Sequence, residues 1–337
     1  MGLGGLLLPV AHQVAPVVGA DLDVVLPGRA LDSLPGFLAV AVAHVFDLVE
    51  PGDRVADVLG VVDRFLLLLR KRVVVSVHLS LLLIVLLSVI VAPAGRVLKI
   101  PGVQRDYASG YSPALGRDIE HLHFGSAGAP LLAFPTSQGR FYQWEDFGLI
   151  AALEDWIESG RLQVWCLDSV DAESWYARER PPRERLERHL QYERYLLDEV
   201  LPALPDPPVA AGTSFGAMHA LLLATRHPSR LRGFIALSGA YDTARWLDGY
   251  SDEDAYLLNP LAYLSGLNDE TYLDPLRAQK PKVVATGEDD PNVADSIKVG
   301  RLLRQKSIDV QLDLWPGWSH DWPYWKEMMR RYTAAIV

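Results

Sequence analysis

One serine in this chain stands in a setting suited to nucleophilic chemistry. Ser214 is the middle residue of Gly-Thr-Ser-Phe-Gly at positions 212–216, and this G-x-S-x-G spacing is typical of a sharp turn between a strand and a helix that exposes the serine hydroxyl. The apolar run 208–211 predicts a buried strand before the turn, and residues 215–227, which end before Pro228, predict a helix after it. Because a serine hydroxyl is a weak nucleophile without a neighbouring base, a base must come from elsewhere in the chain.

A histidine near the C-terminus is the predicted base. When a serine occupies such a turn, an acid and then a histidine follow it along the chain, each on a loop after a strand. Only His227 and His320 lie beyond the interior of the helix that follows Ser214, and His227 stands at the end of that helix. His320 follows the apolar run 310–314 and precedes a helical pattern that continues to the C-terminus. We therefore expect His320 to act as the general base.

Three carboxylates compete for the role of the acid that orients this histidine. The predicted strand 283–286 leads directly into Gly-Glu-Asp-Asp-Pro at positions 287–291. A carboxylate at this point could hold the far ring nitrogen of His320 and stabilise the imidazolium ion. Asp290 is the predicted acid, because its G-x-x-D-P setting matches the usual acid turn. Asp289 is the first alternative and Glu288 the second.

Two backbone N–H groups are needed to stabilise the oxyanion that forms when a serine attacks a carbonyl. The residue after the nucleophile supplies one of them, and a loop after an early strand supplies the other. Phe215 follows Ser214, so its amide is the first predicted donor. The predicted strand 131–134 runs into Pro-Thr-Ser-Gln-Gly at positions 135–139, so we expect the Ser137 amide to be the second.

From residue 103 onward, short apolar runs alternate with helical patterns, which predicts one α/β domain with a mostly parallel central sheet. The helical pattern at 183–201 places leucines and a valine on one face, so its arginines and glutamates are expected to face solvent, and a further helix is predicted at 293–306. No cap domain is evident in the pattern. The predicted strands are residues 119–124, 131–134, 163–167, 209–212, 234–237, 283–286 and 310–314.

Composition excludes several classes of function. The formal net charge is −10 and the isoelectric point is near 5.4, so we expect no nucleic-acid partner, because that affinity comes mainly from Lys and Arg that neutralise phosphates. Cys166 is the only cysteine, in an apolar run, which predicts an inert buried thiol and excludes an internal disulfide. His121 and His123 would share one face of a strand, but no third ligand is apparent, so no metal site is predicted.

Residues 1–102 differ in composition from the rest of the chain. All 9 tryptophans and all 13 tyrosines lie after residue 102. Residues 73–92 consist of Val, Leu, Ile, Ser and Ala with His78 as their only ionisable group, follow a basic triplet and are long enough to span a bilayer. Two interpretations stay open: a membrane anchor at 73–92, or an extension that results from a mis-set start site, with Val103 as the true initiator. A cleaved signal peptide fits poorly, because the apolar run begins far from the N-terminus.

With these residues in place, the chain from about residue 103 to the C-terminus resembles the esterase family of α/β hydrolases that is related to the S-formylglutathione hydrolases and the mycobacterial mycolyltransferases. The resemblance implies an α/β-hydrolase fold with helices on both faces of the sheet and a cofactor-free serine esterase, with Ser214, His320 and an aspartate after the penultimate strand as its catalytic triad. It rests on Phe134-Pro135-Thr136-Ser137, Gly139-Arg140-Phe141-Tyr142, Asp168, Ser174-Trp175-Tyr176, residues 212–220, residues 237–242, His320-Asp321-Trp322 and Trp325.

The sequence therefore predicts a serine carboxylesterase that acts on a small-molecule acyl ester, with no cofactor. An acyltransferase that uses the same acyl-enzyme is one alternative. A non-catalytic, membrane-anchored binding protein that keeps the fold is another, because a fold does not dictate a function. We expect a cytoplasmic location, or a membrane-anchored one if the segment 73–92 is a genuine anchor. The sequence does not indicate the acyl chain length or the oligomeric state.

Overall fold

The computed structural model describes residues 103–337. The predicted N-terminal extension 1–102, with its apolar segment 73–92, lies outside the described residues. No helix within residues 103–337 is both long and apolar enough to cross a membrane.

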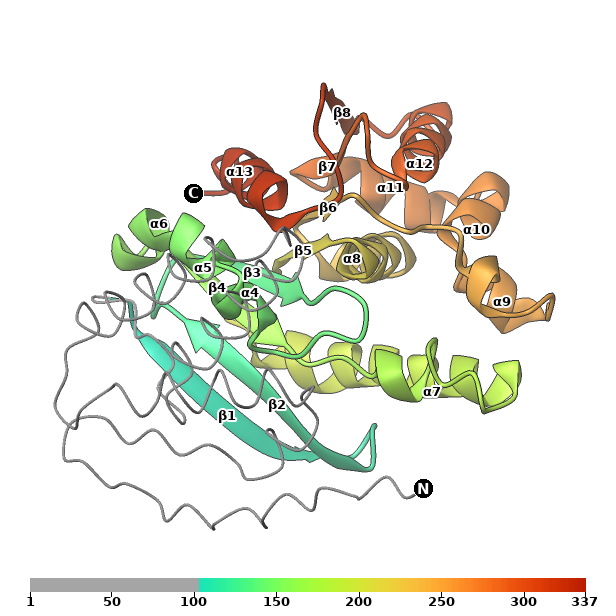
Figure 1. Cartoon of the computed structure of the whole chain (residues 1–337), viewed down its shortest axis with the longest axis horizontal. Coiled ribbons are helices and arrows are strands. Elements are labelled where there is room, and N and C mark those ends of the chain that lie inside the picture. Colours follow the sequence, from blue (N-terminus) through green and yellow to red (C-terminus); the bar gives the residue numbers. More distant parts are fainter. Residues whose placement is uncertain (1–102) are drawn as a thin grey trace, which may run out of the picture. The chain divides into compact units, whose positions relative to one another are not determined.

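The described residues form an eight-stranded sheet with the strand order β1-β2-β4-β3-β5-β6-β7-β8. The pairs β1–β2 and β2–β4 are antiparallel, and every other neighbouring pair is parallel. The prediction of a mostly parallel sheet is therefore confirmed, and Figure 1 shows its strands along the middle of the domain. The strands are β1 (Arg105–Ser112), β2 (Arg117–Phe124), β3 (Ala129–Phe134), β4 (Leu162–Leu167), β5 (Val209–Thr213), β6 (Gly233–Leu237), β7 (Lys282–Gly287) and β8 (Gln311–Trp315).

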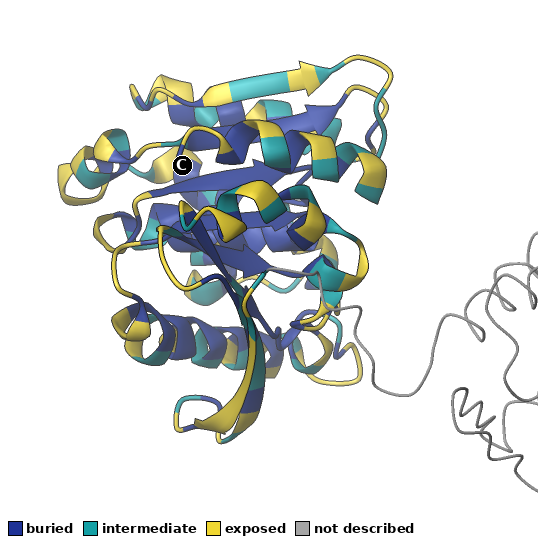
Figure 2. Cartoon of the chain, turned by 90° about the vertical axis from the view of Figure 1, so that its left-hand side faces the viewer, coloured by how far each residue is buried: buried dark blue, intermediate teal, exposed yellow. Residues whose placement is uncertain are grey.

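Strand β1 has no counterpart among the predicted strands. Its sequence Arg-Asp-Tyr-Ala-Ser-Gly-Tyr-Ser has no apolar face, and six consecutive residues of the strand are exposed. Because it pairs with β2 at the edge of the sheet, its backbone hydrogen bonds are satisfied without burial of its side chains. Figure 2 shows the contrast between such exposed strand surface and the buried central strands.

Helices cover both faces of the sheet, as expected. On one face lie α4 (Gln143–Asp146), α5 (Leu149–Ala152), α6 (Glu154–Glu158) and α13 (Trp322–Thr333). On the other lie α7 (Pro182–Tyr195), α8 (Phe215–Arg226), α9 (Glu253–Leu257), α10 (Pro260–Gly266), α11 (Glu270–Ala278) and α12 (Val293–Gln305).

The alternation of side chains along the buried strands explains the two layers. Leu132 and Ala210 enter the core beneath α7 and α8, whereas their neighbours Leu131 and Ala211 enter the core beneath α13. Strands buried on both faces read as continuous apolar runs. This is why short runs of Val, Leu, Ile and Ala located the central strands correctly in the sequence.

The charged face predicted for residues 183–201 is only partly correct. Helix α7 ends at Tyr195 and continues as a π-helical turn, Leu196–Val200. Arg185 is 1% exposed, and it donates hydrogen bonds to the backbone carbonyls of Trp175 and Trp246. Glu193 is also buried; it pairs with Arg226 at the end of α8 and lies 3.0 Å from Nε2 of His227, the residue after that helix. These two charges satisfy groups inside the domain, and a pattern of apolar residues alone cannot reveal such partners.

Candidate active site

The backbone at Ser214 forms the strained turn that the G-x-S-x-G pattern predicts. Ser214 lies between β5 and α8 with φ 56° and ψ −122°, a left-handed conformation that is unfavourable for a residue with a Cβ atom. A Cβ atom at Gly212 would lie 2.1 Å from the carbonyl oxygen of Gly216, and one at Gly216 would lie 2.4 Å from that of Pro135. The two glycines therefore let β5, α8 and the loop after β3 approach closely around the serine.

Of the three predicted triad residues, His320 lies within hydrogen-bond distance of both others. The Nε2 atom of His320 is 2.9 Å from Ser214 Oγ, and its Nδ1 atom is 2.9 Å from Asp290 Oδ2. Ser214 follows β5, Asp290 follows β7 and His320 follows β8, so the three residues meet at the edge of the sheet where these parallel strands end. Of the competing carboxylates, Asp289 and Glu288 are exposed, whereas the side chain of Asp290 is fully buried against the imidazole.

The surroundings of Asp290 keep its carboxylate ionised. Burial by itself would raise the pKa of Asp290, but hydrogen bonds from His320, from the backbone N–H of Asn292 and from Ser238 outweigh burial, so this pKa lies below its ordinary value. The N–H of Asn292 is 2.7 Å from Asp290 Oδ1. At neutral pH the carboxylate can therefore accept a hydrogen bond from the His320 ring and balance a positive charge on it.

Close packing of two loops brings the acid and the histidine together. A Cβ atom at Gly287, the last residue of β7, would lie 1.9 Å from the carbonyl oxygen of Trp318 in the loop after β8. The same carbonyl oxygen accepts a hydrogen bond from the Asp289 N–H at 3.0 Å. The contact fixes the loop with Asp290 against the loop with His320, and only glycine at position 287 permits it.

The loop after β3, which carries Ser137, approaches the elbow at Pro135, next to Gly216. Thr136 donates its N–H to Gln143 Oε1 at 2.7 Å, and Gly139 donates its N–H to the carbonyl of Thr136. Within residues 103–337, no hydrogen bond from the N–H of Ser137 or Phe215 to a protein acceptor is present. Phe215 begins α8, so its amide has no acceptor within the helix. Both predicted oxyanion donors thus retain their hydrogen-bonding capacity.

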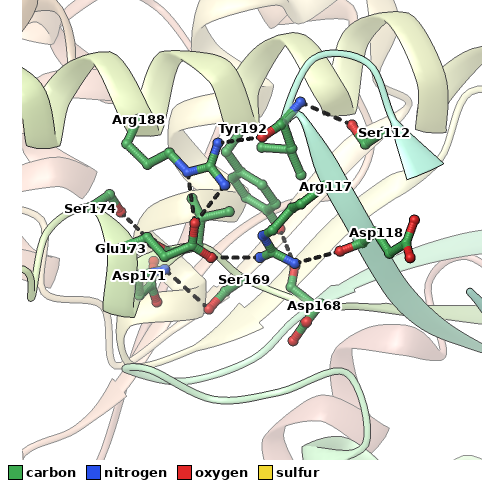
Figure 3. Close-up of polar contacts among 12 residues, drawn as sticks. Ser112, Arg117, Asp118, Asp168, Ser169, Asp171, Glu173, Ser174, Arg188 and Tyr192 are labelled. Carbon is green, nitrogen blue, oxygen red and sulfur yellow. Dashed lines mark hydrogen bonds and ion pairs between the residues drawn. The ribbon is translucent and has the colours of Figure 1, made fainter. Parts of the chain in front are cut away.

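A second loop, after β4, supports the loop that carries Ser137. Arg140 donates from Nε to Asp168 Oδ1 at 2.7 Å, and the hydroxyl of Ser169 donates to the carbonyl of Gly139 at 3.1 Å. The β4 loop is itself anchored to α7, because the hydroxyl of Tyr192 donates to the Asp168 carbonyl at 2.8 Å. Figure 3 shows this anchoring, together with the ion pairs of Glu173.

Aromatic side chains surround the candidate site. The ring of Trp325 meets that of His320 edge to face, with 4.7 Å between centroids. Phe215 is buried beneath two half-buried rings, those of Tyr176 and Trp246, at centroid distances of 5.4 and 5.0 Å. The sequence did not predict that Trp246 packs on Phe215, because no motif links the segment that carries Trp246 to the triad residues.

The remaining histidines of interest are engaged elsewhere. The rings of His121 and His123 stack on Trp165, and burial lowers the pKa of each. His219 lies on the elbow helix, where its Nε2 atom is 2.8 Å from the buried Asp171. In the described part of the chain, no three His, Cys, Asp or Glu side chains are placed to hold a metal ion together.

Comparison with known proteins gives matches of two kinds. A family model for the prolyl oligopeptidase family matches residues 192–336, the part of the chain that contains Ser214, Asp290 and His320. No curated protein matches the sequence. Among solved structures, a ferulic acid esterase matches with a TM-score of 0.55 and 16% identity, covering 69% of this chain and 98% of its own.

Two S-formylglutathione hydrolases match in a similar way. The enzyme from Agrobacterium tumefaciens has a TM-score of 0.55 and 13% identity, covering 70% of this chain and 96% of its own. The enzyme from Staphylococcus aureus has a TM-score of 0.50 and 15% identity, covering 70% of this chain and 97% of its own. At such low identity the likeness is one of fold. Together with the sheet order and the strand-turn-helix elbow, it shows that residues 103–337 have the α/β-hydrolase fold.

Proposed function

We propose that the protein is a serine esterase that cleaves a small-molecule carboxylic ester through an acyl-enzyme on Ser214. The main support is the position of the His320 imidazole between the two other triad residues. The two ring nitrogens of His320 are each 2.9 Å from an oxygen, that of Ser214 on one side and that of Asp290 on the other. With a proton on Nδ1 directed at Asp290, Nε2 is free to accept the serine proton.

In the first half of the reaction, Ser214 Oγ attacks the ester carbonyl and its proton passes to His320 Nε2. Asp290 stabilises the resulting imidazolium, and the amides of Phe215 and Ser137 donate hydrogen bonds to the oxyanion. When the tetrahedral intermediate collapses, the bond to the alkoxy oxygen breaks and His320 gives its proton to the departing alcohol. The acyl group is then esterified to Ser214.

In the second half, water replaces the alcohol. His320 Nε2 takes a proton from the water, whose oxygen attacks the acyl carbonyl of the Ser214 ester. Collapse breaks the bond to Ser214 Oγ, which recovers its proton from His320, and the carboxylic acid leaves. No redox partner or cofactor is needed for either half, because both are acyl transfers between oxygen atoms.

A fluorophosphonate probe tests the nucleophile directly. The wild-type protein should be labelled at Ser214 and should hydrolyse p-nitrophenyl esters, and Ser214→Ala should lose labelling and lower kcat by several orders of magnitude. Ser265→Ala is the matched control, because this exposed hydroxyl contacts only a helix carbonyl. Turnover by Ser214→Ala at the wild-type rate, or labelling at another residue, would contradict the proposal.

The match to the prolyl oligopeptidase family favours peptide hydrolysis as a second candidate activity. A graded series of p-nitrophenyl esters, measured beside p-nitroanilides of short peptides that end in proline, separates the two. An esterase should show a kcat/KM for its best ester far above that for any anilide. Product analysis with an added alcohol then shows whether water or the alcohol receives the acyl group.

A further inference from the structure

A tryptophan outside the triad contacts its base, and a serine that holds this tryptophan is linked to the acid through Asn292. Trp325 lies on α13 and is buried, and its indole N–H donates a hydrogen bond to Ser238 Oγ at 3.0 Å. The same indole meets the His320 ring edge to face, with an interplanar angle of 87°. A single rigid side chain thus touches the base at one end and is held by a hydroxyl at the other.

The backbone of Ser238 is fixed in an unusual conformation. Ser238 follows β6 with φ 56°, a left-handed conformation, and is fully buried. Its N–H donates to the carbonyl of Ala285 at 2.8 Å, and its carbonyl accepts from Asn292 Nδ2 at 3.1 Å. Asn292 in turn donates its own N–H to Asp290. The position of the Ser238 hydroxyl relative to the acid is therefore set by the backbone on both sides.

Ser238 connects the indole to the acid through Asn292. An indole N–H can only donate, so Ser238 Oγ accepts from Trp325. The carbonyl of Ser238 accepts from the Asn292 side chain, and the backbone N–H of Asn292 donates to the Asp290 carboxylate. The contacts close a ring in which Trp325 reaches Asp290 through Ser238 and Asn292, Asp290 reaches His320, and His320 returns to Trp325.

We propose that Ser238 and Trp325 are positioning residues that hold Asp290 and His320 in the reactive arrangement of the esterase site, an inference that rests on the proposed function. The Ser238 hydroxyl anchors the indole, the Ser238 carbonyl holds Asn292 against the carboxylate, and the indole limits rotation of the imidazole. Because the rate of acyl transfer depends steeply on the alignment of the base with the nucleophile, loss of either contact lowers kcat. Neither residue belongs to the triad or to the predicted oxyanion donors, so KM changes little.

Ser238→Gly is the sharpest test, because glycine adopts a left-handed conformation without strain. The variant removes the hydroxyl while the backbone hydrogen bonds remain. We expect kcat for the best p-nitrophenyl ester to fall about tenfold, because loss of the hydrogen bond that anchors the indole misaligns the base, with KM within about twofold of wild type. The urea midpoint of unfolding should not decrease. Ser238→Ala, which retains the left-handed strain, should show the same loss of kcat.

Trp325→Phe keeps an aromatic ring and removes the N–H that anchors it. It should also lower kcat with little effect on KM. The double variant Ser238→Gly with Trp325→Phe should lose no more than about threefold beyond the worse single variant, because residues that act as one unit are not additive. Ser296→Ala and Trp315→Phe are the matched controls. Ser296 is buried with no hydrogen-bond partner among the described residues, and the Trp315 N–H bonds Tyr332.

The outcomes separate this inference from the proposed function. A wild-type protein that neither turns over esters nor reacts with the fluorophosphonate overturns the proposed function, and the inference falls with it. A reactive wild type with unchanged kcat in Ser238→Gly overturns the inference alone. Losses that multiply in the double variant, or losses of equal size in the two controls, would also overturn it, because they would indicate general destabilisation.

Discussion

At the scale of single residues, the choice among three adjacent carboxylates depends on backbone direction. Glu288 donates its N–H to the carbonyl of Trp315 at the end of β8, and Asp289 donates its N–H to the carbonyl of Trp318 in the loop after β8. Those two bonds hold the start of the turn, so the third carboxylate, Asp290, is directed inward at His320. The turn pattern in the sequence favoured Asp290, but the pattern gives no contact between two loops that are distant in the chain.

Asp290→Asn should therefore be far more damaging than the same change one residue earlier. An amide cannot balance the imidazolium charge, and it can hold the ring with the wrong nitrogen protonated, so kcat should fall by about three to four orders of magnitude. Asp289→Asn should stay within about twofold of wild type. The measurement is kcat/KM for p-nitrophenyl esters in both variants. A larger loss in Asp289→Asn would reassign the acid.

At the scale of elements, the site depends on loops that support each other at the ends of parallel strands. The loop after β3 carries Ser137, and Arg140 ties this loop to Asp168 of the β4 loop. Sequence reasoning found both segments because their strands are apolar runs. The sequence did not show that the two loops contact each other, because the partners of Arg140 are 20 and 28 residues away along the chain.

Arg140→Ala should loosen the predicted oxyanion loop without loss of the fold. Complete removal of one oxyanion donor lowers kcat by about 100- to 1000-fold. A misplaced donor should cause only part of this loss, so we expect kcat to fall by about tenfold. Arg161→Ala is the control, because this exposed arginine bonds only the neighbouring Ser159 hydroxyl through its guanidinium. Steady-state kinetics at saturating ester check the expectation. An unchanged kcat would mean that the ion pair does not hold the loop in place.

The contact of Glu193 on α7 with Arg226 on α8 should make the stability of the protein depend on pH. Burial alone would raise the pKa of Glu193, but hydrogen bonds and charges from His227 and Arg226 lower it to about 2. A lowered folded-state pKa stabilises the protein fully above the unfolded value, near 4.5, and this contribution is lost as pH falls through about 2.

Glu193→Gln should therefore reduce the free energy of unfolding by about 3 kcal/mol at pH 7. The difference from wild type should shrink as the pH falls from about 4.5 to 2. Glu184→Gln, an exposed glutamate on the same helix, serves as the control. Urea unfolding at several pH values measures both variants. A difference that stays constant over this range would show that Glu193 acts through packing and not through its charge.

Burial determined which strands could be predicted from the sequence. The strands β3 to β7 read as apolar runs because both of their faces are covered, whereas β1 is polar and exposed and gave no such signal. Arg185 was expected in solvent because arginine usually is, yet its guanidinium satisfies carbonyls of two loops. A buried charge of this kind becomes evident only when its partners are known.

At the scale of the whole molecule, both hydrophobic cores and the candidate site are built from residues 103–337. We therefore expect a protein that begins at residue 103 to fold by itself. It should unfold in a single cooperative transition and hydrolyse esters with a kcat/KM within about twofold of the full chain. Circular dichroism during urea titration and parallel kinetics test this. An insoluble or inactive product would show that the preceding residues are required.

Residues 243–278, which lie between β6 and β7 and follow Ser238, provide none of the three triad residues, although they carry α9, α10, α11 and the Trp246 ring that packs on Phe215. Exchange of this insert could therefore retune substrate preference while the reaction chemistry stays intact. In directed evolution it is the natural place to graft or randomise sequence.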